Sequence, residues 1–372
     1  MIAPIDVQEL PPHAQNMLNE AANPKMRLAA ARGIVPGLKP PEIVTLLTAL
    51  ALGPAGDVAT TAHDTLVHLP PPVLNGALTG NLQAAVIDEL AQAYGNNSDI
   101  VAPLLRMARL DLDTVERLAK RGNEAITELV ATNQERLIER PKLIELLYMN
   151  EHTRMSTADR LIEFAVRSGI QLHSIAAWGE MVRAIEGELI PEPGEEPLPD
   201  DLEYRAVANL AKQLTDDAIE TPFQEDEEGQ EQLVEKYMPL YQAIAAMSVS
   251  QKVRRAMLGT KEERALLLRD QNRLVASAAI RSPRIQEPEV VSVSQNRNVS
   301  EDVLRVIANT GAWSKSYQIK KNLVENPRCP VGIAQKMVVQ LHEADLHRLA
   351  KNKNVSGAVR QAAKRHLDRR KT

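Results

Sequence analysis

The chain has 372 residues, a formal net charge of −5, and 44% hydrophobic but only 3% aromatic residues. This length is too great for one compact core, so two domains or one long repeat array is expected. The shortage of Phe, Tyr and Trp argues against an all-β sandwich or barrel and favours closely stacked helices. The single cysteine, Cys329, excludes an internal disulfide and any multi-cysteine metal site, and it fits a reducing compartment.

Charge is divided unevenly along the chain. Residues 186–231 hold 16 acidic and 2 basic side chains, whereas residues 232–372 hold 26 basic and 12 acidic ones. The acidic segment is rich in proline and poor in apolar residues, which predicts a linker that is partly disordered. One helical patch, residues 204–214, interrupts it and could be a short docking helix. The sequence therefore predicts an N-terminal block (1–185), an acidic linker (186–231) and a basic C-terminal block (232–372).

A short apolar pattern recurs in both blocks. An apolar residue is followed by a polar or proline-containing turn, and apolar residues return five and eight positions later. The copies are Leu38-Ile43-Leu46, Leu110-Val115-Leu118, Ile285-Val290-Val293, Val299-Leu304-Ile307 and Leu341-Leu346-Leu349. Such self-similarity is typical of a stack of short helical units, none of which can bury its own apolar face. The expected fold class is all-α, a helical-repeat α-solenoid with two blocks joined by the acidic linker.

Capping residues predict helix boundaries in the first block. Asn23-Pro24 precedes a helix, with the proline at its first turn. Asp113 and Glu116 have the spacing of a capping box, in which each side chain bonds the other residue's backbone amide. Ser156 is expected to cap a helix that ends at Gly169, in the left-handed conformation that glycine adopts easily.

The second block is more regular. Thr260 and Glu263 have capping-box spacing. Four related turns follow, each with an Asn or Ser that can bond local backbone and an apolar residue that can seal two stacked helices. These turns begin at Ser282, Asn296, Asn326 and Asn352. Trp313 lies in the longer interval between the turns at Asn296 and Asn326. It is expected to fill the wider gap there, with a ligand platform as the alternative.

Asn23-Pro24, Asn326-Pro327 with Pro330, and the apolar pattern resemble the variant leucine-rich repeat. More broadly, they resemble the HEAT and armadillo class of α-solenoids. Residues 272–372 also resemble helical-repeat modules of uncharacterised bacterial proteins. Variant leucine-rich repeat proteins can carry an iron–sulfur cluster on grouped cysteines, but Cys329 stands alone, so no cofactor is expected. The HEAT-like class includes DNA glycosylases, whose aromatic and acidic constellation has no match here.

Motifs for catalysis and metal binding are weak. His342 and His347 are five residues apart, so their rings would lie about 140° apart around a helix and could not share one metal. The sequence has neither a glycine-rich phosphate loop nor a nucleophile elbow. Cys329 lies in a proline-flanked turn and is interpreted as an apolar plug. The sequence also has no recognisable signal peptide and no apolar run of about 18 residues. A cytoplasmic protein that is not an enzyme is expected.

The basic block carries the candidate contact surface. On a helix from about Ser356 to Arg370, basic residues flank an apolar stripe, and further basic residues precede the helix. The candidate contacts for an anion or a partner are Arg254, Arg255, Lys320, Lys321, Arg348, Lys351, Lys353, Arg360, Lys364, Arg365, Arg369 and Arg370. The alternative is a solvated helix that caps the repeat array with a polar face.

Two functional hypotheses follow. The favoured one is a non-enzymatic scaffold or adaptor that binds a protein partner through its helical-repeat surface. The alternative is a nucleic-acid-associated protein that uses the basic block, with binding that weakens steeply with salt. Interleaved aromatic residues for base stacking are absent, which disfavours specific single-strand recognition. In a variant of both hypotheses, the acidic linker folds back on the basic block and competes with its ligand.

Overall fold

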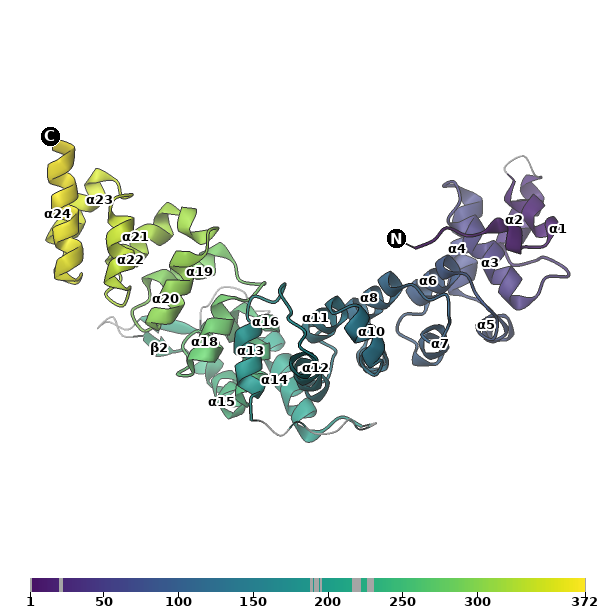
Figure 1. Cartoon of the computed structure of the whole chain (residues 1–372), viewed down its shortest axis with the longest axis horizontal. Helices are drawn as coiled ribbons and strands as arrows, with labels where there is room; N and C mark the ends of the chain where they lie inside the picture. The colour runs from purple at the N-terminus through teal and green to yellow at the C-terminus, as the bar shows by residue number, and fades with distance from the viewer. Residues whose placement is uncertain are drawn as a thin grey trace. The chain divides into compact units, whose positions relative to one another are not determined.

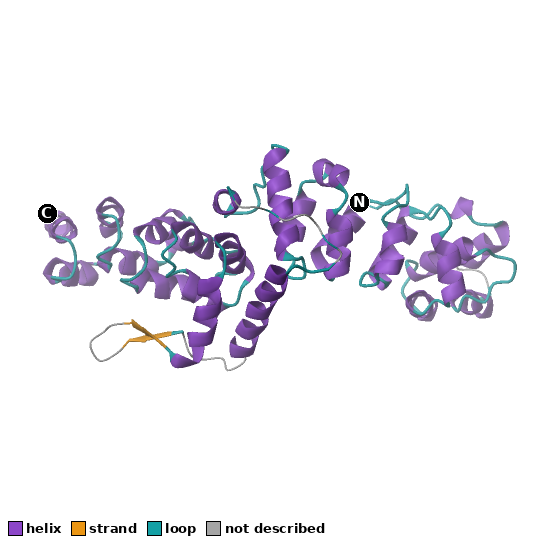
Figure 2. Cartoon of the chain, turned by 90° about the horizontal axis from the view of Figure 1, so that it is seen from below, coloured by secondary structure: helices purple, strands orange, loops and turns teal. Residues whose placement is uncertain are grey.

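The computed structural model describes residues 2–19, 23–187, 190, 194, 196–215, 222–225 and 231–371. Within these residues the fold is all-α, as predicted, with 24 α-helices, three short 3₁₀ helices and one two-stranded hairpin (Figures 1 and 2). The chain divides into two compact units, residues 1–161 and 162–372, and helix α12 runs across the division. None of the described helices has the length and apolar character needed to cross a bilayer.

The first unit is built from short helices. They are η1 (Val7–Glu9), α1 (Pro12–Leu18), α2 (Pro24–Ala31), α3 (Pro40–Ala51), α4 (Asp57–Val67), α5 (Pro71–Leu78), α6 (Ala84–Ala93), α7 (Ser98–Leu104), α8 (Leu112–Arg121), α9 (Glu124–Ala131), α10 (Gln134–Glu139), α11 (Lys142–Met149) and α12 (Met155–Arg167). Prolines stand at the first turns of α1, α2, α3 and α5, where the missing N–H has no intrahelical partner to lose.

The predicted helix boundaries of this region are confirmed in two places and wrong in two. The predicted cap at Ser156 is wrong, because α12 begins at Met155 and Ser156 lies within the helix. Asn23 caps α2 by accepting a hydrogen bond from the Lys25 amide at 3.0 Å. Gly169 follows α12 with φ of +69°, in the left-handed region. The capping box at Asp113 is wrong, because α8 begins earlier and Asp111 caps it by accepting from the Asp113 amide at 2.8 Å. The Glu116 side chain is therefore free to pair across helices, and it does so with α10–α11 residues.

The second unit contains the more regular repeats. Its elements are α13 (Trp178–Ile185), α14 (Pro199–Thr215), β1 (Phe223–Glu225), β2 (Glu231–Leu233), η2 (Glu235–Tyr237), α15 (Met238–Ala246), α16 (Val249–Leu258), α17 (Lys261–Leu267), α18 (Arg273–Ile280), α19 (Glu287–Gln295), α20 (Glu301–Asn309), η3 (Trp313–Lys315), α21 (Tyr317–Glu325), α22 (Val331–Val338), α23 (Glu343–Lys351) and α24 (Gly357–Lys371). Strands β1 and β2 are antiparallel, with Phe223 opposite Leu233.

From α16 onward, alternate helices pack against one another. Helices α16, α18 and α20 pack in succession, α19 packs on α21, and α22 packs on α24 (Figure 1). The turns between the helices are of two kinds. Those after α17, α19, α21 and α23 all have five residues (268–272, 296–300, 326–330 and 352–356). Those after α16, α18, α20 and α22 range from two to seven residues (259–260, 281–286, 310–316 and 339–342).

Asparagine closes three of the five-residue turns in the predicted way. The side-chain oxygens of Asn296, Asn326 and Asn352 accept from the backbone amides two residues later, at 2.7, 2.9 and 2.9 Å. The apolar plugs that follow are buried; they are Val299, Cys329 and Val355. The Ser282 turn makes similar bonds but belongs to the variable-length kind, and its Ile285 is half-buried. Trp313 lies half-buried in η3, inside the longest of the variable turns.

The Asn326 side chain also joins consecutive repeats. Its Nδ2 donates to the carbonyl oxygens of Ser294 and Asn296, at 3.0 and 2.9 Å, at the end of α19. Asn150 does the same in the first unit, because its Nδ2 donates to the carbonyl of Ala119 at 2.9 Å and of Gly122 at 3.0 Å. A buried amide in this position satisfies backbone groups that a helix end leaves without partners.

The core includes most of the predicted apolar pattern and two buried ion pairs. All positions of the pattern are buried except Leu38, Ile43, Leu110 and Ile285, which are half-buried. Arg255 pairs with Glu263, which also accepts from the Thr260 amide at 2.7 Å, so the predicted capping box is confirmed. In the same way, Arg264 pairs with Glu289 at 2.8 Å, and Glu289 accepts from the amide of Gln286 at 3.0 Å. Each of these carboxylates caps its own helix and binds an arginine of an earlier one, which is α16 for Glu263 and α17 for Glu289.

The acidic segment contains more structure than the predicted linker. Residues 199–215 form α14, which extends the predicted helical patch, and Tyr204 on α14 is buried. The hairpin is fastened by Glu231, which accepts from Arg269 at 2.6 and 3.1 Å and from the Asn296 side chain at 2.8 Å. The Arg269 guanidinium in turn lies 3.9 Å from the centroid of the Phe223 ring. The predicted boundaries at 185/186 and 231/232 therefore fall inside one compact unit. Of the stretches predicted to be linker or disorder, residues 199–204 lie in α14 and 223–225 in β1, whereas 188–189, 191–193, 195, 220–221 and 226–230 lie outside the described residues.

Candidate functional site

Two members of the predicted basic surface are not on the surface. Arg254 is fully buried and Arg255 is 5% exposed, and both guanidinium groups lie 5.3 Å from the centroid of the Tyr204 ring. Arg255 also binds Glu263 through two nitrogens. The prediction that these arginines contact an external anion is therefore wrong, because α14 covers them and Glu263 neutralises Arg255.

Two further members are engaged by acidic residues. Lys321 lies 3.1 Å from Asp345, and Arg348 bonds Glu325 at 2.7 Å and Asp345 at 3.0 Å. The hydroxyl of Tyr317 also donates to Asp345. This hydrogen bond and the neighbouring cations hold the pKa of Asp345 below its usual range, against a smaller opposing effect of burial. The cluster joins α21 to α23 and leaves little unbalanced charge.

The other predicted residues lie near the C-terminal end of the second unit. Lys351, Lys353, Lys364, Arg365 and Arg369 are exposed. Lys320 and Arg360 are half-buried, and the side chain of Arg370 is outside the described residues. The predicted set is thus not one surface, because the structure separates it into a buried pair, a paired cluster and an exposed basic group.

A site that the sequence did not predict lies on helices α13, α18 and α20. Here an open groove of about 640 Å³ is lined by four arginines, two acidic residues and a few apolar and polar side chains. The arginines are Arg183 of α13, Arg273 of α18, Arg281 just after α18, and Arg305 of α20. Half-buried Leu274 and Val306 contribute apolar surface between them. We call this feature the arginine groove.

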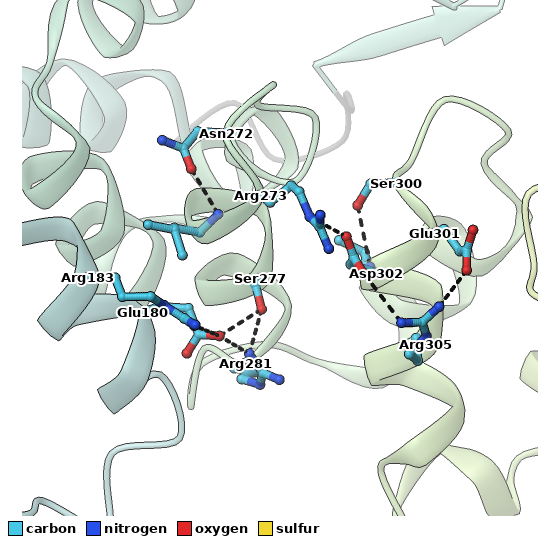
Figure 3. Close-up of polar contacts among 12 residues, drawn as sticks. Glu180, Arg183, Asn272, Arg273, Ser277, Arg281, Ser300, Glu301, Asp302 and Arg305 are labelled. Carbon is cyan, nitrogen blue, oxygen red and sulfur yellow. Dashed lines mark hydrogen bonds and ion pairs between the residues drawn. The ribbon is translucent and has the colours of Figure 1, made fainter.

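One end of the arginine groove is organised by Glu180. Its carboxylate, 10% exposed, accepts from the Ser277 hydroxyl at 3.1 Å and from the Arg281 guanidinium, and it lies 3.5 Å from Arg183 (Figure 3). The same combination of a hydroxyl, an arginine and a carboxylate on a neighbouring helix occurs twice in the first unit. The two cases are Thr114 and Arg117 with Asp88, and Thr157 and Arg160 with Glu128. This part of the groove is therefore a helix-to-helix tie that fixes Arg281 in place.

The other end of the groove is more open. Arg273 is 76% exposed, and its Nε lies 2.6 Å from Asp302. Arg305 lies 3.8 Å from Asp302 and bonds Glu301 at 2.5 Å (Figure 3). Among the described residues, both terminal nitrogens of Arg273 are without a partner. A guanidinium presents five N–H donors in a planar fork, so Arg273 can bind a further carboxylate through two nitrogens.

The groove carries an excess of positive charge. Its four arginines face Glu180 and Asp302 within the lining and Glu301 beside it, so one positive charge is not neutralised there. The sequence signal for this site was available in part, since Arg273, Ser277 and Arg281 are spaced four residues apart and must lie on one helix face. Their neighbours could not be found in this way, because Glu180 is separated from Arg281 by 101 residues.

We compared the chain with protein-family models, with curated proteins and with solved structures, and none of them matches it.

Proposed function

We propose that this protein is a non-enzymatic scaffold, and that it binds an acidic segment of a partner protein in the arginine groove. The observation that carries the proposal is the excess of guanidinium groups over carboxylates along α13, α18 and α20, with Arg273 largely exposed. Arginine is the side chain best suited to planar, two-point recognition of carboxylates.

The apolar part of the groove supports a polypeptide as the ligand. Leu274 and Val306 lie between the charged side chains, so a bound segment could bury aliphatic side chains as well as place its carboxylates. A groove that combines a polar rim with an apolar centre has the composition of protein interaction surfaces. The array of short helices would supply a rigid support on which several such segments could be held.

The proposal is tested with the full chain and a fluorescent poly-L-glutamate 20-mer as the probe. Fluorescence anisotropy at 50 mM salt would compare the wild type with the double variant Arg183→Glu, Arg273→Glu. An exposed ion pair contributes about 0.2–1 kcal/mol, so reversing two charges is expected to weaken binding about tenfold. The matched control is Arg121→Glu, Arg167→Glu, which makes the same charge change at exposed positions outside the groove.

Partner capture completes the test. Affinity purification and mass spectrometry would use the same three proteins as bait. A partner rich in Asp and Glu that is retained by the wild type and the control but lost by the groove variant would support the proposal. Equal binding of poly-L-glutamate by all three proteins would refute the groove as the site.

A further inference from the structure

The cations of the second unit differ in how they are paired. Those in the arginine groove and in the core have acidic partners, as described above. From Leu346 to Thr372, in contrast, nine basic residues accompany a single acidic one, Asp368. Five of these basic side chains have no acidic partner among the described residues. They are Lys351, Lys353, Arg360, Lys364 and Arg365, which we call the terminal basic surface.

Helix geometry places these five side chains at one end of the second unit. Helix α24 buries Val359, Ala363 and Leu367, which are four residues apart and face the rest of the unit. Arg360 and Lys364 lie beside this stripe, one turn or about 6 Å apart, and Arg365 lies on the outer face. Lys351 and Lys353 are at the end of α23 and in the five-residue turn that leads into α24. Because α23 and α24 pack on each other, the turn brings these lysines to the start of α24 (Figure 1).

The chemistry of this surface selects its partner. Within α23 and α24 no large apolar side chain is exposed in the described residues, because the apolar stripe of α24 is buried. Basic residues alone attract anionic lipids, but stable binding of a helix to a lipid surface also needs an inserted apolar face, which is not available here. The interior of a protein interface also requires buried apolar contacts. A ligand held by charge alone, with closely spaced negative groups, is left.

The residues around the surface distinguish a duplex from a single strand. The sequence has no Phe, Tyr or Trp after Tyr317. Proteins that bind single strands stack bases on aromatic side chains, whereas contacts to duplex phosphates need only Lys and Arg. We infer that the terminal basic surface binds the phosphate backbone of double-stranded nucleic acid without reading its sequence. This activity is independent of the arginine groove.

The experiment measures anisotropy of a fluorescent 20-base-pair duplex with the full chain, between 50 and 200 mM salt. The test variant replaces Lys351, Lys353, Lys364 and Arg365 with Gln. Binding at 50 mM salt is expected to weaken at least tenfold, and the slope of log Kobs against log salt is expected to become shallower by about 2 to 4. Because these side chains are exposed, the thermal unfolding midpoint should stay unchanged, and a variant with Arg at the three lysine positions should bind as the wild type does.

The matched control replaces four exposed cations of the first unit, Lys25, Arg32, Lys120 and Arg121, with Gln, which gives the same net charge. Retained duplex binding by this control supports the inference, as does retained binding by the groove variant. An equal loss in the control, or no binding by the wild type at 50 mM salt, would overturn it. Tighter binding to a single strand, or binding to vesicles with 30% phosphatidylserine but not to the duplex, would overturn the choice of ligand.

Discussion

Replacing the buried residue Asn326 with Ala should lower the free energy of unfolding of the second unit by several hydrogen bonds' worth. The side chain is 5% exposed, and it makes three hydrogen bonds to the backbone. Two of them, from Nδ2 to the carbonyls of Ser294 and Asn296, join consecutive repeats. Alanine would remove these bonds and leave both carbonyls without their side-chain donor.

The size of the effect can be worked out by comparison with Asn352. The Asn352 side chain makes the same local bond, to the amide of Asn354 at 2.9 Å, but none through its Nδ2 among the described residues. A net contribution of about 1 kcal/mol per hydrogen bond gives about 1 kcal/mol for Asn352→Ala and about 3 kcal/mol for Asn326→Ala. The difference of about 2 kcal/mol measures the tie between repeats, because the local turn is common to both positions.

Urea unfolding followed by tryptophan fluorescence suits this comparison, since the two tryptophans, at 178 and 313, both lie in the second unit. Hydrogen exchange of peptides from α19 and α21 would show whether the loss is local to the joined repeats. If Asn326→Ala costs no more than Asn352→Ala, the Nδ2 bonds do not stabilise the fold and the reasoning fails.

Three further outcomes are expected. Glu263→Gln leaves the Arg255 charge buried without its partner, so it should lower the free energy of unfolding in urea by about 3–5 kcal/mol. The control Glu301→Gln, in an exposed ion pair, should lower it by less than about 0.5 kcal/mol. Similar losses in the two variants would contradict the burial argument. Burial, and to a lesser degree Glu301, raises the pKa of the Cys329 thiol to about 11. A thiol reagent at pH 8 should therefore react slowly with Cys329 until urea is added. Rapid labelling of the native protein would disprove this. Burial opposes ionisation of Glu231, but its hydrogen bonds outweigh burial and lower its pKa. The contribution of the Glu231 carboxylate to stability should therefore be present above the unfolded pKa near 4.5 and disappear as pH falls. Glu231→Gln should lower the free energy of unfolding by about 1 kcal/mol at pH 7 and by little at pH 3. A loss that does not depend on pH would contradict this.

The sequence predicted the fold class well because the signals for it are local. Capping residues, prolines at first turns and the apolar spacing each act within about ten residues, and helices of a repeat array follow from them. The arginine groove depends instead on which helices become neighbours, as when Glu180 of α13 reaches Ser277 of α18, and no local pattern contains that information. Arg254 and Arg255 were assigned to the surface for the same reason, since their burial is imposed by Tyr204, which lies 50 residues earlier in the chain.

The two kinds of turn have a consequence for how such an array can change its length. Asn326 and Asn150, which each bind two carbonyls of an earlier repeat, both lie in five-residue turns (326–330 and 150–154). One inserted residue there would draw the amide away from those carbonyls. The opposite turns already vary from two to seven residues. Extra sequence, natural or engineered, should therefore be accommodated along that second edge, and residues 310–316 are the place where a grafted peptide would disturb the array least.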